Sequence, residues 1–301
     1  MRIMITGGSG LIGRALVDSL AQAGHEVIVL SRTPETVKNL PKNARAEKWD
    51  GQSALGWSQW IDSNTAIVNL AGATISKRWT ESQKQAIRDS RIKAGRAVVE
   101  AVKAASQKPA VVVQSSAVGY YGPRGSEEIG EEVSAGSDFL ASVAKDWEGS
   151  TAELEQLGVR RVIVRTGVVL DKRGGALPLM ALPVKMFVGG PLAGGKQYLP
   201  WIHLDDEVAA IRFLIENSTA KGAYNLSAPQ PLTNAEFTKV LGKVLGRPTF
   251  MPTPGFALKL VLGEMSALVL DGQRQMPKRL LAAGFKFKFG DAASALRAIY
   301  N

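Results

Sequence analysis

The sequence predicts an α/β protein: a doubly wound parallel Rossmann sheet with a smaller C-terminal substrate lobe. Three observations support this fold class. Residues 1–30 read as strand, glycine-rich loop, helix and strand. Short apolar runs then alternate with helical patterns as far as Thr166, an alternation typical of parallel sheets. After Gly167 the chain becomes rich in Gly, Pro and Leu, which indicates a change of architecture.

Composition narrows the classes of function. The chain has 301 residues, enough for one large domain or a core with a smaller lobe. It has no cysteine, which excludes disulfides, thiolate metal sites and a thiol nucleophile, and favours a cytoplasmic address. Only two histidines occur, His25 and His203, so we predict no metal site. No apolar run reaches the length of a membrane-spanning helix and no signal peptide precedes the first strand, so we expect no membrane partner.

The net charge of +10 favours anionic partners. Charge alone leaves two alternatives open, a phosphorylated cofactor and a nucleic acid. The basic residues are interleaved with acidic and apolar ones, and no motif that combines aromatic and basic residues occurs. The sequence therefore argues against a nucleic-acid partner.

The glycine-rich loop is the most specific motif of the sequence. Gly8, Gly10 and Gly13 satisfy G-x-G-x-x-G, and Gly7 begins an overlapping G-x-x-G-x-x-G. The loop follows the predicted strand at 2–6 and opens a helix that Gly24 ends, which is the context of a dinucleotide-binding site. Such a loop presents backbone N–H groups to a pyrophosphate, whereas the alternative is a purely structural turn. We expect cofactor contacts from Gly7, Ser9, Gly10, Leu11, Ile12 and Gly13.

The end of the second predicted strand, Glu26–Leu30, selects the cofactor. NAD sites place an acidic residue there, and NADP sites place an arginine for the 2′-phosphate. This sequence has Ser31 and Arg32, which can donate to a phosphate and clamp it. Glu35 argues the other way, and the alternative for Arg32 is a solvated loop cation. The sequence therefore predicts NADP(H).

Two further strands are predicted at Ala44–Trp49 and Ala66–Leu70. The second is followed by the small residues Ala71 and Gly72. Ligands of open α/β sheets bind at the carboxyl ends of the strands, so we expect Leu70, Ala71 and Gly72 beside the cofactor. A plain turn is the alternative.

A capping box that begins at Thr80 predicts a helix as far as about Ala105. Ile87, Arg91 and Ala94 fall on its inward, apolar face. A buried charge without a partner is costly, so Arg91 should bind an anion such as the cofactor phosphates. The alternative is a guanidinium directed outward to solvent.

Hydroxyl groups follow the next predicted strand, Ala110–Ser115. Ser116, Tyr120 and Tyr121 lie just beyond it, where a hydroxyl and a phenol form a candidate acid–base pair. The alternative is a loop in which the tyrosines only pack. Ser115 joins the expected cofactor contacts.

A long helix is predicted at Asp138–Leu157, and it carries Lys145 as a candidate catalytic residue. The last core strand is predicted at Arg160–Thr166. Arg165, near the end of this strand, joins the expected cofactor contacts.

Beyond the core, Asp171–Gly195 is expected to be a mobile segment on the substrate side. A strand is predicted at Tyr198–His203 and another at Ala223–Leu226. Asp205 and Thr233 are expected to cap the helices that follow them. These elements define a core at 1–170 with returning elements near 198–227. They also define a substrate lobe at 171–197 and 228–301, with a distinct C-terminal domain at about 250–298.

Four motifs spread along the chain belong together: Thr6–Gly13, Asn69–Gly72, Ser115-Ser116 with a following Tyr-Gly, and Trp201–Asp206. With these motifs the chain resembles an extended short-chain dehydrogenase/reductase, the group of nucleotide-sugar epimerases and dehydratases. The C-terminal run is similar to the domain of unknown function in the YfcH-like "epimerase family protein" subgroup, through Gly272-Gln273-Arg274, Pro277-Lys278-Arg279-Leu280 and Ala283-Gly284-Phe285.

The resemblance implies an NADP(H)-binding protein whose substrate is generally unassigned. It places cofactor contacts at the glycine loop, Ser31, Arg32, Leu70, Ala71 and Arg91, and it makes Ser116 the family's catalytic serine. Related members have been described as cell-division-inhibitor-like, and a homodimer is common in the superfamily.

The sequence departs from this family in one catalytic motif. Reductases of this type use a tyrosine as acid or base, with a lysine four residues later, and no Tyr-x-x-x-Lys occurs here. An alignment on Glu148 puts Leu140 and Ala144 at the two positions. An alignment on Lys145 puts Ala141 at the tyrosine position. The phenol is missing in both.

Two functions remain open at this point. The first is an NADP-dependent oxidoreductase or epimerase-like enzyme that acts on a small, anionic carbonyl or sugar-nucleotide compound. In it, Tyr120 or Tyr121 replaces the missing tyrosine and Arg124 or Lys145 tunes the phenol. The second is a non-catalytic NADP(H)-binding regulator that recognises a protein partner. The missing motif favours the regulator, whereas Ser116 and the tyrosine pair favour the enzyme.

Overall fold

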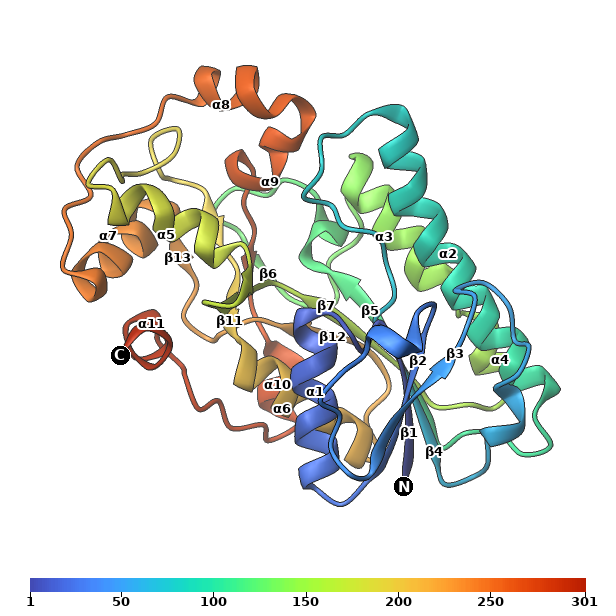
Figure 1. Cartoon of the computed structure of the whole chain (residues 1–301). Helices are drawn as coiled ribbons and strands as arrows, with labels where there is room; N and C mark the ends of the chain where they lie inside the picture. The colour runs from blue at the N-terminus through green and yellow to red at the C-terminus, as the bar shows by residue number, and fades with distance from the viewer.

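The computed structural model describes residues 1–301 and confirms the doubly wound parallel sheet. The sheet has seven strands in the order β12-β7-β5-β4-β1-β2-β3 (Figure 1). The strand order reverses between β1 and β4, which is where open α/β sheets form a ligand crevice. The bounds are β1 Arg2–Thr6, β2 Glu26–Ser31, β3 Ala44–Lys48, β4 Thr65–Asn69, β5 Val111–Ala117, β7 Arg161–Thr166 and β12 Gly222–Leu226.

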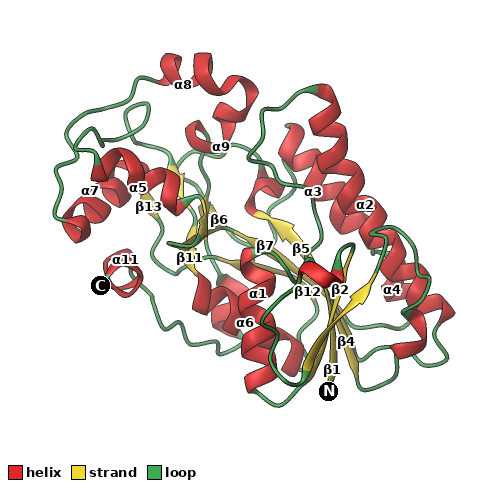
Figure 2. Ribbon diagram, in the orientation of Figure 1, coloured by secondary structure: helices red, strands yellow, loops and turns green.

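Helices cover both faces of this sheet (Figure 2). Alternate residues of β1 point to opposite faces, so Ile3 and Ile5 pack in one core cluster and Met4 in another. The first cluster is closed by α1 and α6, and the second by α2 and α4, while α3 packs beside α2. These helices are α1 Leu11–Gln22, α2 Glu81–Ala104, α3 Phe139–Gly149, α4 Glu153–Gln156 and α6 Leu204–Glu216.

Two of the predicted helix caps are confirmed, and one is wrong. Thr80 accepts a hydrogen bond from the backbone of Gln83, and Thr233 forms a complete capping box with Glu236. His203, rather than Asp205, caps α6, because its Nδ1 accepts from the backbone N–H of Asp205 at 3.0 Å.

The single helix expected at Asp138–Leu157 is instead divided into α3 and α4. The break follows Gly149, where the Ser150 hydroxyl donates to the carbonyl of Trp147 at 2.6 Å. This backbone turn packs closely on α2, where a Cβ on Gly95 would lie 1.9 Å from Ser150 Oγ. A straight helix would not fit this contact.

The lobe consists of short strands and small helices at one end of the molecule (Figure 1). The segment Asp171–Gly195, expected to be mobile, contains the helix α5 Leu177–Lys185, in which Pro178 occupies the first turn and needs no N–H donor. No helix has the length and apolar character that crossing a bilayer requires. The remaining elements are β6 Glu128–Ile129, β8 Val168–Asp171, β9 Gly174–Gly175, β10 Tyr198–Leu199, β11 Trp201–His203, β13 Leu232–Thr233, β14 Arg274–Gln275, α5 Leu177–Lys185, α7 Asn234–Leu245, α8 Gly255–Leu262, α9 Ala267–Leu270, α10 Lys278–Ala282 and α11 Ala292–Tyr300, with single turns of 3₁₀-helix at η1 Pro34–Thr36, η2 Ser58–Trp60, η3 Val118–Tyr121 and η4 Gly263–Ser266.

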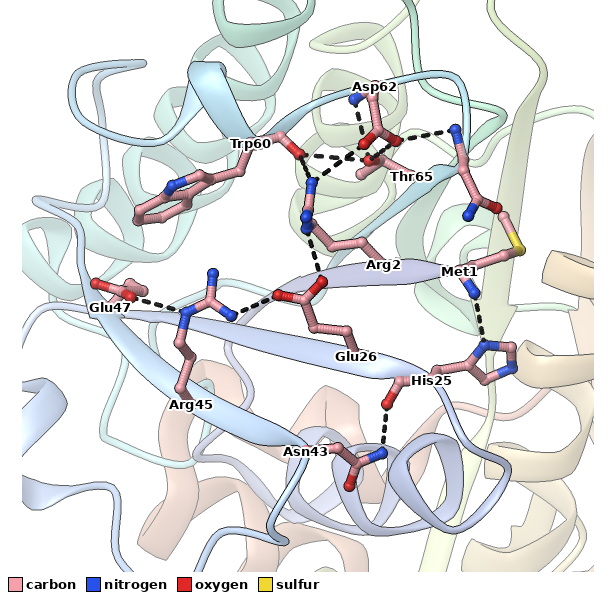
Figure 3. A network of polar contacts seen from close by, with 11 residues as sticks. Met1, Arg2, His25, Glu26, Asn43, Arg45, Glu47, Trp60, Asp62 and Thr65 are labelled. Carbon is pink, nitrogen blue, oxygen red and sulfur yellow. Dashed lines mark hydrogen bonds and ion pairs between the residues drawn. The ribbon is translucent and has the colours of Figure 1, made fainter.

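Ion pairs join the amino ends of the first strands (Figure 3). Arg2 pairs with Glu26 at 3.0 Å and with Asp62 at 3.2 Å, and Arg45 bridges Glu26 and Glu47. This network lies at the opposite edge of the sheet from the crevice. It therefore holds the strands together and takes no part in the candidate site.

Candidate functional site

The glycine loop brings its backbone against the end of β4. Gly7 has a φ of +71°, and a Cβ there would lie 2.8 Å from the carbonyl of Leu70. A Cβ on Gly13 would lie 2.3 Å from the carbonyl oxygen of Gly7, so α1 can approach the loop only with glycine at this position. Gly10 precedes α1, and no side chain caps this helix. The N–H groups of its first turn are therefore available to an anion.

A row of buried polar side chains joins β1, β4 and β5 near their carboxyl ends. Thr6 donates to Asn69 at 2.6 Å, and Asn69 donates to Gln114 at 2.9 Å. The Thr6 hydroxyl also accepts from the N–H of Ala71 at 3.2 Å, and Gln114 donates to the carbonyl of Ser115 at 2.7 Å. This row fixes the two expected cofactor residues Ala71 and Ser115. Thr6 and Gln114 were not among the predicted site residues, although polar residues near the ends of apolar strands are a usable signal.

Arg91 reaches from α2 to the residues that follow β4. A Cβ on Gly72 would lie 2.9 Å from the guanidinium carbon, and Arg91 donates to the carbonyls of Ala73 and Ile87 at 3.0 and 2.9 Å. The guanidinium also stacks over the Trp147 ring at 4.9 Å. Burial lowers the pKa of Arg91 to about 10, so it remains charged at neutral pH. No carboxylate pairs with it, which leaves a cation without a counter-ion beside the crevice.

Cationic groups also meet at the carboxyl end of β2. Ser31 and Lys48 are partners in the β2–β3 register, and Lys48 Nζ donates to the carbonyl of Arg32 at 2.5 Å. The exposed Arg32 side chain lies along Gly51, where a Cβ would be 3.6 Å from Arg32 Cδ. Glu35 is exposed in η1 and forms no ion pair with Arg32. Lys48 was not among the predicted site residues, because only the strand register brings it to Ser31.

Ser116 and Tyr121 belong to one closed, buried network rather than to an open acid–base pair. Ser116 donates to Glu148 at 2.7 Å, and Arg165 holds both oxygens of Glu148 at 2.9 and 3.0 Å. Arg165 also donates to the Tyr121 hydroxyl at 3.0 Å, and that hydroxyl donates to Asn225 at 2.6 Å. Burial raises the pKa of Tyr121 to about 12, although the Arg165 charge opposes the shift. Arg165 therefore uses its N–H donors on other groups of the protein.

The other candidate acid–base residues lie outside this hydrogen-bonded network. The half-buried ring of Tyr120 stacks on the Arg165 guanidinium at 3.6 Å, and its hydroxyl forms no hydrogen bond. Lys145 is exposed on α3 and has no polar partner. Leu140, one of the residues aligned with the family tyrosine, packs against Gly119, where a Cβ would be 3.2 Å from Leu140 Cβ. No phenol replaces it there.

A cavity of about 230 Å³ opens between the loop after β5 and the lobe. Gly119, Asp138 and Leu140 line it from the core, and Asp271 and Gln273 line it from the lobe. A second hollow of about 590 Å³ under α8 shares Asp271 with it.

Two carboxyl groups in this cavity were missed by the sequence analysis. Asp138 Oδ1 accepts from the backbone of Ala141 at 3.0 Å, whereas its buried Oδ2 has no partner. Burial and the charge of Asp138 raise the pKa of Asp271. Asp271 follows a helix near the end of the chain, so only the tertiary fold brings it to the carboxyl end of β5.

Comparisons with known proteins agree with a dinucleotide-binding fold. Residues 3–227 match the model of the NAD dependent epimerase/dehydratase family, and residues 253–299 match a Domain of unknown function (DUF1731). The chain is 40% identical to the chloroplastic epimerase family protein SDR39U1 homolog of Arabidopsis thaliana, with 99% of this chain and 86% of the plant protein covered. It is 39% identical to the epimerase family protein YfhF of Bacillus subtilis, with 98% and 97% covered.

Solved structures show the same fold. The crystal structure of human epimerase family protein SDR39U1 with NADPH has a TM-score of 0.88 and 34% identity, and 99% of each chain is covered. The UDP-glucose 4-epimerase of Thermus thermophilus has a TM-score of 0.78, with 99% of this chain and 97% of that chain covered, and at 18% identity it supports the fold alone.

Proposed function

Because this chain belongs to the NAD dependent epimerase/dehydratase family, we propose that it is an NADP(H)-dependent, epimerase-like oxidoreductase that acts on a small carbonyl compound. The observation that carries the proposal is the cavity beside Gly119 and Leu140. It sets the carboxyl of Asp271 beside the loop that follows β5, the strand next to β4 in the sheet. A reductase needs this combination of a cofactor crevice and a neighbouring proton source.

The residues around the crevice fit NADP(H). The free N–H groups at the start of α1 suit the pyrophosphate, and the unpaired guanidinium of Arg91 suits a second phosphate contact. Ser31, Arg32 and Lys48 offer a hydroxyl and two cations to the 2′-phosphate. When bound, the nicotinamide ring supplies or accepts a hydride.

The proton side of the reaction falls to this chain's own groups. When a carbonyl carbon gains a hydride, its oxygen must gain a proton. Tyr121 is a poor donor, because its hydroxyl is bonded to Asn225 and its pKa is raised to about 12. Asp271 faces the cavity, and its raised pKa keeps its proton to a higher pH than an ordinary aspartate. In our proposal Asp271 donates this proton to the substrate oxygen and regains one from solvent, and it accepts the proton in the reverse reaction.

The experiment is a screen of NADPH consumption against a panel of small carbonyl compounds and sugar nucleotides. With a substrate that reacts, Asp271→Asn should lower kcat about 100- to 10,000-fold, the usual contribution of a general acid. Glu264→Gln is the matched control, since Glu264 lines the same cavity but is exposed and paired with Lys84. NADPH affinity should be equal in both variants. Full turnover by Asp271→Asn would contradict the assignment.

One observation favours the alternative of a non-catalytic NADP(H)-binding regulator in the cytoplasm. Ser116, which matches the family's catalytic serine, is bonded to Glu148, and the hydroxyl of Tyr121 is bonded to Asn225. Neither side chain opens to the cavity. A protein that binds NADPH but consumes it with no member of the panel would support the regulator. A protein that turns over any of them would support the enzyme.

A further inference from the structure

The lobe exposes an unusual number of large hydrophobic side chains. Apart from Leu55 and Leu281, all such exposed residues lie in two stretches, 179–188 and 250–261. Leu260 is 81% exposed and Phe256 is 76% exposed, and both lie on α8, a helix without any buried residue. Exposed apolar side chains gathered in this way mark an interaction surface.

The two stretches lie side by side. The N–H of Met251 donates to the carbonyl of Gly189 at 3.1 Å, and the Arg247 guanidinium lies 4.6 Å from the centre of the Phe187 ring. Met186, Phe187 and Val188 are thus neighbours of the exposed Met251. Helix α5 packs against α7, and in Figure 1 both lie with α8 in the lobe, at the end of the molecule away from the strands β1–β4. We call residues 179–196 and 239–261 the lobe surface.

The charge of the lobe surface has a single sign. No aspartate or glutamate occurs from Lys185 to Leu204 or from Phe237 to Gly263. All the cations of these two stretches are exposed, and none forms an ion pair. They are Lys185, Lys196, Lys239, Lys243, Arg247 and Lys259.

We propose that the lobe surface docks on an anionic lipid bilayer. Apolar side chains such as Phe256 and Leu260 would enter the boundary between headgroups and acyl chains, while the cations pair with anionic headgroups. A second copy of this chain fits less well as a partner. In a two-fold dimer the lobe surfaces of the two copies would face each other, and their cations would repel.

This inference stands apart from the proposed enzyme activity. It also departs from the sequence-based expectation of no membrane partner, which considered spanning helices and signal peptides but not attachment to the surface of a bilayer. Attachment to the surface of a bilayer requires no spanning helix, so the absence of such a helix does not oppose it.

The first test uses the absence of cysteine from the chain. Leu260→Cys accepts a single environment-sensitive fluorophore, and we expect its emission to shift to the blue on phosphatidylcholine vesicles that contain phosphatidylglycerol. Vesicles of phosphatidylcholine alone should give little shift. Leu55→Cys is the matched control, because Leu55 is 82% exposed but lies outside the lobe surface, and its label should not respond.

The second test distinguishes an effect of positive charge on vesicle binding from an effect of impaired folding. Lys243→Glu with Arg247→Glu should lower vesicle affinity by at least about 25-fold, since each cation near an anionic surface contributes about fivefold. Lys93→Glu with Arg96→Glu makes the same change of charge on α2, where both residues are exposed, and should change the affinity little. Thermal melting should be alike in both variants.

Two results would overturn the inference. A Leu260 label that is unaffected by phosphatidylglycerol vesicles would show that the lobe surface does not insert. A label that is already buried in the absence of vesicles, together with a dimer in solution, would assign the surface to a second copy of the chain.

Discussion

Glu207 makes the stability of the protein depend on pH in a way that one substitution can remove. This residue of α6 is fully buried, and the Thr166 hydroxyl donates to its Oε1 at 2.7 Å. Its Oε2 is buried without a partner. Burial raises the pKa of Glu207 from 4.5 to about 8, although the bond from Thr166 opposes the shift. The carboxyl is therefore protonated in the folded protein at neutral pH.

The sign and size of the pH dependence follow from the difference between the pKa of Glu207 in the folded protein and its pKa in the unfolded chain. Below pH 4.5 the Glu207 carboxyl is protonated in both the folded and the unfolded protein. Between pH 4.5 and about 8 it is protonated only in the folded protein. Stability is thus fully present at low pH and falls by about 1.4 kcal/mol per pH unit across this window, to a total of about 5 kcal/mol. Glu207→Gln keeps the shape of the side chain but has no proton to lose, so the decline should disappear.

The assay is urea unfolding of both proteins, followed by tryptophan fluorescence at a series of pH values across the window. The buried amide of the variant costs about 1–3 kcal/mol at every pH, so the slopes are compared rather than the absolute values. Subtraction of the two curves removes the contribution of other titrating groups. Parallel curves for the two proteins would refute the reasoning, because they would show that Glu207 is ionised in the folded state.

Three further variants test the candidate site. Arg32→Ala should abolish a preference for NADPH over NADH while it leaves NADH affinity unchanged, as titration calorimetry with both cofactors would show; an unaltered preference would remove Arg32 from the 2′-phosphate site. Arg91→Met should weaken NADPH binding about 10- to 100-fold, the value of a charge-assisted contact; it also loses the bonds to the carbonyls of Ala73 and Ile87 and should lower the melting temperature of the free protein, so binding is measured well below that temperature. Tyr121→Phe removes the buried hydrogen bonds that join the Tyr121 hydroxyl to Asn225 and Arg165 and should cost about 1–3 kcal/mol of unfolding free energy, and a large loss of NADPH turnover at unchanged stability would instead return Tyr121 to the chemistry.

The fold could be predicted because its signals are local. Strand runs, the glycine loop and the caps at Thr80 and Thr233 all act over a few residues, and the structure has them at the expected places. Arg91 could also be singled out locally, since a cation on an apolar helix face demands an explanation. The break after Gly149 could not, because it depends on packing against a distant helix.

The chemistry of the site depends more strongly on contacts between distant residues. Tyr121 follows a strand end and so resembles a catalytic phenol, but its partner Asn225 lies on a strand about a hundred residues further along the chain. Asp271 comes from the lobe, and only tertiary packing places it in a cavity with Asp138. Local patterns therefore singled out the glycine loop and Arg91, but not the carboxyl group that we propose as the proton source.

The polar row of Thr6, Asn69 and Gln114 also bears on how the sheet finds its strand order. The strands β1, β4 and β5 are short apolar runs that resemble one another, so hydrophobicity alone distinguishes their neighbours poorly. Thr6 pairs with Asn69 and Asn69 with Gln114 in register, and the two bonds can form together only when β4 lies between β1 and β5. A shift by one residue would leave these groups unbonded among apolar side chains. The same row that supports the crevice thus discriminates against misfolded sheets with other strand orders.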